Sequence, residues 1–76
     1  MIDGRKRKII KAFGEQLRKA REKRGLSLRE LSAMTGVDHA QIYRIEDGQA
    51  DARITTVVEL ADALEVDPGD LFAFHR

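Results

Sequence analysis

Residues 26–48 read LSLRELSAMTGVDHAQIYRIEDG, a run that begins with a helix-capping pattern. Ser27 is followed three residues later by Glu30, so the Ser27 hydroxyl can accept from the Glu30 amide while the Glu30 carboxylate accepts from the Ser27 amide. Gly36 can adopt the left-handed conformation that closes many helices. We therefore predict a helix over about 28–35 that ends at Gly36.

A second helix start follows at once, because Asp38 can act as an N-cap with Gln41 at the third helical position. Only Val37 and Asp38 separate this helix, expected over about 38–47, from the preceding glycine. Two helices joined so closely must cross at a steep angle.

Three further helices complete the predicted fold. Apolar residues at helical spacing predict the first over 8–23 and another over 55–64, and Asp67 followed by proline predicts the start of the last. The helix over 55–64 could start at either Arg53 or Thr55, and the sequence leaves this choice open. Since no stretch alternates like a strand, we predict an all-α fold, a compact five-helix bundle.

The charge is divided unevenly along the 76 residues. Residues 1–25 hold ten Lys or Arg and three acids, residues 26–50 two and four, and residues 51–76 two and six. The first third therefore carries +7 and the last −4. This asymmetry suggests either that the N-terminal third faces an anion or that the chain has a solvated charged helix and an acidic tail end. We expect a basic flexible arm over 1–7 and a single domain over 8–76, and whether the arm contacts this anion stays open.

Several classes of function are disfavoured by the composition. There is no cysteine for a disulfide or thiolate metal site, and no apolar run of about 20 residues for a membrane span. Asp67 and Asp70 are explained as acids in the first turn of a helix, so we predict no metal and no cofactor. Ser27 and Ser32 serve capping and packing, which leaves no catalytic nucleophile, and we expect a cytoplasmic protein that is not an enzyme.

The outer face of the helix over 38–47 carries the chemistry. With Ile42 and Ile45 turned inward, the helical period leaves a stripe of five residues on the opposite side: His39, Ala40, Tyr43, Arg44 and Asp47. Arginine can bind a guanine edge through two hydrogen bonds, histidine and tyrosine can bond bases or phosphates, and alanine can meet a thymine methyl. The stripe is suited to reading the major groove of DNA.

The sequence resembles the phage-repressor and Cro-like (XRE-type) helix-turn-helix transcriptional regulators over about residues 13–72. The residues that carry the resemblance are Gly14 with Leu17, Arg18 and Arg21; Gly25-Leu26-Ser27 with Glu30-Leu31; Gly36-Val37; Ile42 with Arg44-Ile45-Glu46 and Gly48; and Leu60-Ala61, Ala63-Leu64 and Val66. Restriction-modification controller proteins and small phage or mobile-element repressors are two kinds of member between which the sequence does not choose.

The resemblance implies a helix-turn-helix formed by the second and third helices, with the third in the major groove. By position, it implies that three residues contact bases, namely His39, Ala40 and Arg44. It implies phosphate contacts from Ser27, Leu28, Gln41, Tyr43, Gln49 and Arg53, to which we add Arg29. It also implies a structural ion pair between Arg21 and Glu46.

Three positions depart from the family pattern. Leu28 stands where a polar phosphate-binding side chain is common, so we expect this contact to reduce to a backbone amide. Asp47 replaces the usual Asn and should repel phosphate unless it points away. Arg53 stands where a small N-cap residue is typical.

The apolar C-terminus suggests self-association. Leu71, Phe72 and Phe74 follow Val66 and offer more apolar surface than one small core absorbs, so we expect these three to form a homodimer interface. Family geometry then places two recognition helices about 34 Å apart on a pseudo-palindromic operator. The alternative is that Phe72 and Phe74 fold back over the monomer core.

We therefore predict sequence-specific binding of double-stranded DNA by a transcriptional regulator, either repressor or activator, associated with the nucleoid. The alternative is an antitoxin or a protein-interaction adaptor built on the same fold, because a fold does not settle function. A protein partner therefore remains open.

Overall fold

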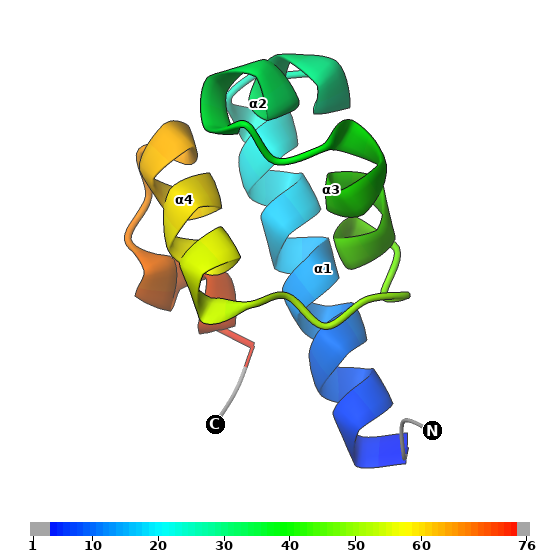
Figure 1. The fold of residues 1–76 in the computed structure, drawn as a ribbon. Coiled ribbons are helices and arrows are strands. Elements are labelled where there is room, and N and C mark those ends of the chain that lie inside the picture. Colours follow the sequence, from blue (N-terminus) through cyan, green and yellow to red (C-terminus); the bar gives the residue numbers. More distant parts are fainter. Residues whose placement is uncertain (1–3, 75–76) are drawn as a thin grey trace.

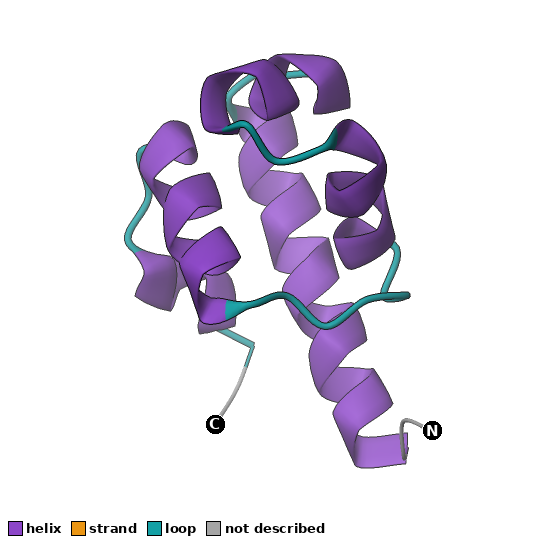
Figure 2. Ribbon diagram, viewed as in Figure 1, coloured by secondary structure: helices purple, strands orange, loops and turns teal. Residues whose placement is uncertain are grey.

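A computed structural model describes residues 4–74 of the chain. It contains four α-helices and one short 3₁₀ helix, in the order α1 (Gly4–Lys23), α2 (Leu28–Thr35), α3 (His39–Glu46), α4 (Ile54–Leu64) and η1 (Pro68–Phe72) (Figure 1). Figure 2 shows only helices and loops in this part of the chain. Every helix within residues 4–74 is too short or too polar to cross a lipid bilayer.

The long helix α1 packs against α3 and η1, while α2 packs against α3 and α4, and α4 against η1. The core is made of side chains from all five elements: Phe13, Leu17, Leu31, Ile42, Ile45, Val57, Leu60, Ala61, Leu64 and Leu71. Burial of each large aliphatic side chain is worth about 1.5 to 3 kcal/mol. The apolar face of α3 is therefore fixed on the bundle by the hydrophobic effect.

The capping box predicted at the start of α2 is confirmed. The Glu30 amide donates to the Ser27 hydroxyl at 3.0 Å, and the Ser27 amide donates to Glu30 Oε1 at 2.8 Å. Gly36 closes the helix with φ of 77° and donates to the Ser32 carbonyl. These local signals position the turn that leads into α3.

The second capping prediction was wrong in its mechanism, although α3 begins where expected. Asp38 precedes the first helical residue, but its carboxylate accepts no hydrogen bond from the α3 amides. It lies instead beside the His39 ring, with 3.6 Å between Asp38 Oδ1 and His39 Nδ1. Since Ile42 is fully buried and Val37 packs against the core, packing anchors this helix start.

The two ends of the fold also differ from prediction. The first helix begins at Gly4, so residues 4–7, assigned to a flexible arm, are helical, while residues 1–3 lie outside the described part. The fifth α-helix is replaced by η1, where the Asp70 amide donates to the Asp67 carbonyl. Only five residues form this element, and such short turns adopt the tighter 3₁₀ geometry readily.

The C-terminal apolar residues are partly absorbed by the monomer. Leu71 is only 2% exposed, so the structure does not leave it available as an interface residue. The Phe72 ring lies 5.2 Å from that of Phe13 and 6.4 Å from that of Phe74, which packs against the core. Phe72 nevertheless remains 45% exposed.

The open question at the start of α4 is also answered. Arg53 is the N-cap residue, with an extended backbone and no side-chain cap bond, and Ile54 is the first helical residue.

Candidate nucleic-acid interface

The position of α3 divides its residues into a buried and an outward side. Ile42, Ile45 and Glu46 are buried, whereas Tyr43 and Arg44 are exposed. His39 and Ala40, at the start of the helix, are half-buried. The expected stripe therefore lies on the outward side, which we call the reading face: His39, Ala40, Tyr43, Arg44 and Asp47.

A close helix crossing fixes the distance between α1 and α3. A Cβ atom at Gly14 would lie 2.3 Å from the Ile45 carbonyl oxygen and 2.7 Å from that of Glu46. No side chain fits there, so the backbone of α1 meets the carbonyl end of α3 directly. Gly14 weakens the intrinsic stability of α1 but permits this contact.

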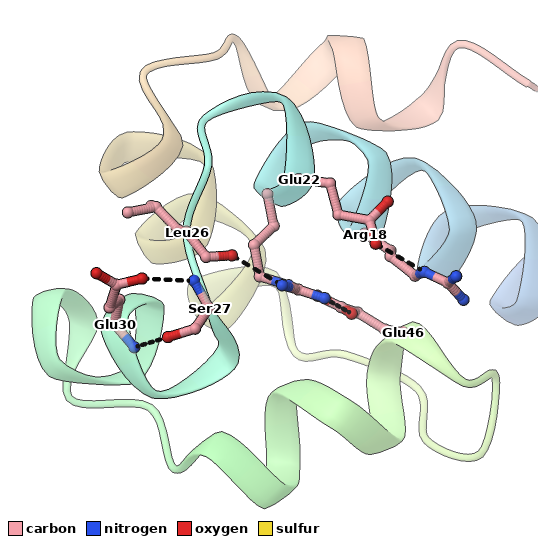
Figure 3. A network of polar contacts seen from close by, with 7 residues as sticks. Arg18, Glu22, Leu26, Ser27, Glu30 and Glu46 are labelled. Atoms are coloured by element: carbon pink, nitrogen blue, oxygen red, sulfur yellow. Dashed lines mark hydrogen bonds and ion pairs between the residues drawn. The ribbon is translucent and has the colours of Figure 1, made fainter.

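An ion pair joins the same two helices. Arg21 donates through Nε and Nη2 to the two carboxylate oxygens of Glu46, at 2.7 and 2.9 Å, and through Nη1 to the Leu26 carbonyl at 2.8 Å (Figure 3). The Glu46 side chain is only 4% exposed. Hydrogen bonding to Glu46 raises the pKa of Arg21 above its ordinary value. The ion pair expected from the family is thus present.

The first turn of α2 lies beside the reading face. Ser27 and Arg29 are exposed and Leu28 is half-buried. Leu28 and Tyr43 line a common cleft, which places the beginning of α2 next to the middle of α3. Backbone amides at a helix start attract phosphate, so Leu28 can contribute through its main chain.

Other polar candidates are held by neighbouring side chains. Arg44 Nη2 donates to Gln41 Oε1 at 3.0 Å, which restrains the arginine on the reading face. Gln49 donates through Nε2 to the Asp47 carboxylate. This bond partly offsets the negative charge of Asp47, which is exposed. Arg53 is exposed at the start of α4.

One basic residue near the site had been given no role from the sequence. Arg18 lines the cleft shared by Leu28 and Tyr43, and its side chain is 63% exposed. Its Nε atom forms an ion pair with Glu22 Oε2 at 3.4 Å (Figure 3). The sequence held one signal for a role of Arg18: it lies three residues before Arg21, which puts both arginines on the same side of α1.

Comparisons with known proteins agree with this geometry. Residues 12–74 match a protein family described as a helix-turn-helix domain. The chain is 41% identical over 58 residues to the HTH-type transcriptional repressor RghR of Bacillus subtilis (strain 168), a match that covers 75% of this chain and 43% of RghR. The chain thus spans less than half the length of this relative.

Solved structures show the same fold. The restriction-modification controller protein C.AhdI from Aeromonas hydrophila is similar with a TM-score of 0.81 and 33% identity, over 83% of this chain and 96% of that one. An HTH_3 family transcriptional regulator from Vibrio cholerae is similar with a TM-score of 0.84 and 32% identity, over 91% of this chain and 39% of that one. The chain therefore belongs to the helix-turn-helix family, in the phage-repressor and Cro-like form that its sequence resembles.

Proposed function

We propose that this protein is a transcriptional regulator that binds double-stranded DNA in a sequence-specific manner and inserts α3 into the major groove. The observation that carries the proposal is the reading face, whose polar side chains project from a helix held by core packing, Gly14 and the Arg21–Glu46 pair. A rigid helix about 10 to 12 Å wide fits the major groove, which is about 12 Å wide. Such a regulator acts in the cytoplasm, at the nucleoid.

The side chains divide into two roles in this proposal. Base edges are contacted by His39, Ala40 and Arg44, and the Arg44 guanidinium suits the two acceptors of a guanine. The phosphates on either side are contacted by Ser27, Leu28, Arg29, Gln41, Tyr43, Gln49 and Arg53. Phosphate contacts set the position of the helix, while the base contacts select the sequence.

We further propose a homodimer on a pseudo-palindromic operator. Because Leu71 is buried, the exposed apolar surface differs from that expected from the sequence. Phe72 remains a candidate interface residue, and three others are added: Ile9, Ile54 and Val58, with exposed fractions of 38%, 82% and 41%. Ile9, Phe72 and Val57 line one small cavity. Ile54 and Val58 lie on α4 before and after Val57 in the sequence. Exposed apolar side chains on a small domain suit an interaction site, and a two-fold axis would let the same residues of two copies face each other.

Selection of bound fragments from random duplex DNA tests the proposed function. The protein should enrich one motif with two-fold symmetry, and its binding constant should fall steeply as salt rises because phosphate contacts release counterions. Failure to enrich any motif, together with affinity that ignores salt, would contradict the proposal. Enrichment of a single half-site would keep DNA binding but remove the dimer.

A further inference from the structure

The first turns of α1 form a basic helical segment that projects from the body of the domain. Residues 4–14 contain five Lys or Arg and no acid, and residues 4–9 are all exposed. Figure 1 shows these turns extending past the loop that joins α3 and α4. The segment from Gly4 to Lys11 spans about 10 Å as an α-helix.

This segment is electrostatically disfavoured when isolated. The positive end of the helix dipole lies at its N-terminus, where cations are destabilising, and the first turn of α1 has no acidic residue. Arg7 and Lys11 are four residues apart, so their like charges repel along one side of the helix. An anion beside them would remove both penalties.

The side of α1 that carries Arg7 and Lys11 is the side that meets α3. A spacing of four and three residues places five positions along one stripe of the helix: Arg7, Lys11, Gly14, Arg18 and Arg21. Gly14 and Arg21 of this stripe contact the end of α3 directly. Arg7 and Lys11 therefore continue the stripe away from α3, toward the projecting end of α1.

Lys11 also lies against the loop that leaves α3. A Cβ atom on Gly48 would be 3.2 Å from the Lys11 Cα atom, and Lys11 lines a cleft together with Asp47. The next residue after Gly48 is Gln49, one of the phosphate contacts in the proposed function. The basic segment thus starts beside a proposed phosphate contact and continues from there along the projecting turns of α1.

From this arrangement we propose that Arg7 and Lys11 bind the phosphate backbone of the DNA that flanks the base pairs read by α3. The inference rests on the proposed DNA binding and adds a second helix to the interface. The contact carries no sequence information, and it strengthens binding to cognate and unrelated duplexes alike.

The double variant Arg7→Gln/Lys11→Gln tests the contact, and Lys23→Gln/Arg24→Gln is the matched control. The control removes the same charge at and just after the C-terminal end of α1, from residues that line the cleft beside Leu64 and Asp70. Binding is measured by fluorescence anisotropy at several salt concentrations, with a long duplex that extends past the selected motif and a short duplex trimmed to it. Circular dichroism checks that both variants keep their helices.

On the long duplex, Arg7→Gln/Lys11→Gln should reduce the slope of log affinity against log salt by about 1 to 2, since each phosphate contact contributes about 0.9. The loss of affinity should be the same for the selected motif and a scrambled sequence, and it should vanish on the trimmed duplex. The control should keep the wild-type slope. If both variants bind the long duplex equally well, the contact does not exist, although the proposed function stands.

Two other outcomes would contradict the contact in different ways. If the wild-type protein binds no duplex, the proposed function itself fails, and this inference with it. If Arg7→Gln/Lys11→Gln alters sedimentation in the absence of DNA and leaves the salt slope unchanged, the segment contacts the acidic C-terminal third of a second copy, and the DNA contact is overturned.

Discussion

Arg21 donates to both carboxylate oxygens of Glu46 and to the carbonyl of Leu26, so one guanidinium joins α1, the turn before α2 and the end of α3. The helix that carries the reading face is therefore tied to the bundle by a charged contact as well as by its apolar side. Removing either partner would leave the other charge almost buried and without its bonds.

We expect Arg21→Ala and Glu46→Ala each to reduce the free energy of unfolding by about 2 to 4 kcal/mol, because a stranded buried charge is costly. The double variant should lose less than the sum of the two. Urea denaturation of the four proteins gives the coupling energy. Strict additivity would show that the two side chains do not interact in solution.

Gly14→Ala should be destabilising even though alanine is the better helix former by about 1 kcal/mol. The added methyl would collide with the carbonyl oxygens of Ile45 and Glu46, and these backbone atoms can move only if α1 and α3 separate. Gly4→Ala is the matched control, since a Cβ there meets nothing within 4 Å. Thermal denaturation should show a lower midpoint for Gly14→Ala alone, and an unchanged or higher midpoint would contradict the close crossing.

Arg44→Ala should weaken binding to the selected DNA motif by about 1 to 3 kcal/mol and relax the preference at one base position. Arg29→Ala, which removes a proposed phosphate contact, should weaken all sequences by the same factor. Affinities for the motif and its single-base variants distinguish the two effects. Equal, sequence-independent losses for both variants would remove Arg44 from base readout.

Ile54→Ser should convert the proposed dimer to a monomer without unfolding it, because Ile54 is 82% exposed in the single chain. Met34→Ser, at another exposed apolar residue on α2, should leave the dimer intact. Sedimentation velocity at micromolar concentration measures both. A wild-type protein that sediments as a monomer throughout would exclude the proposed assembly.

The capping box gives the fold a defined response to acid. Hydrogen bonds from the Ser27 amide and hydroxyl keep the pKa of Glu30 below its ordinary value. The pKa is thus lower in the folded than in the unfolded state, so the stabilisation is present at neutral pH and is lost as the pH falls through the folded value. Glu30→Gln retains an acceptor for the Ser27 amide but cannot titrate.

The urea midpoints of wild type and Glu30→Gln should therefore converge as the pH falls from about 6 to about 3. Glu59→Gln on α4 controls for the loss of an exposed carboxylate. A constant difference between wild type and Glu30→Gln across this range would rule out the capping contribution.

The sequence predicted local features better than the ends of the chain. Ser27, Glu30 and Gly36 act within one or two turns, so their pattern alone defined α2. Asp38 had the same pattern, yet its carboxylate lies beside the His39 ring. Residue spacing does not determine which rotamer a side chain adopts.

The structure of the chain ends depends on helix propensity and on packing, which the apolar periodicity does not show. Arg5 to Lys8 looked like a flexible arm because of their charge, but Arg and Lys are good helix formers and no proline or glycine separates them from Ile9. Leu71 belongs to an apolar run that could face inward or outward, and only the packing of η1 decides that it is buried.

The candidate site was predictable in part. Once Ile42 and Ile45 are assigned to the core, the helical period alone places Arg44 on the outward side. The bond between Arg44 and Gln41 and the cleft shared by Leu28 and Tyr43 depend on side-chain conformations and helix crossing, which the spacing does not encode. The roles of these residues toward DNA remain predictions, since they depend on a partner outside the chain.

The backbone contact at Gly14 has a consequence for how such a domain can change. It fixes α3 through main-chain atoms that every amino acid shares, and so it does not depend on which side chains occupy the reading face. In the proposed function, His39, Ala40 and Arg44 contact bases, so exchanging them would change the operator preference while this backbone contact stays in place. If the three residues select the bases as proposed, a set of mutually independent gene switches could be built on this one backbone by varying those positions.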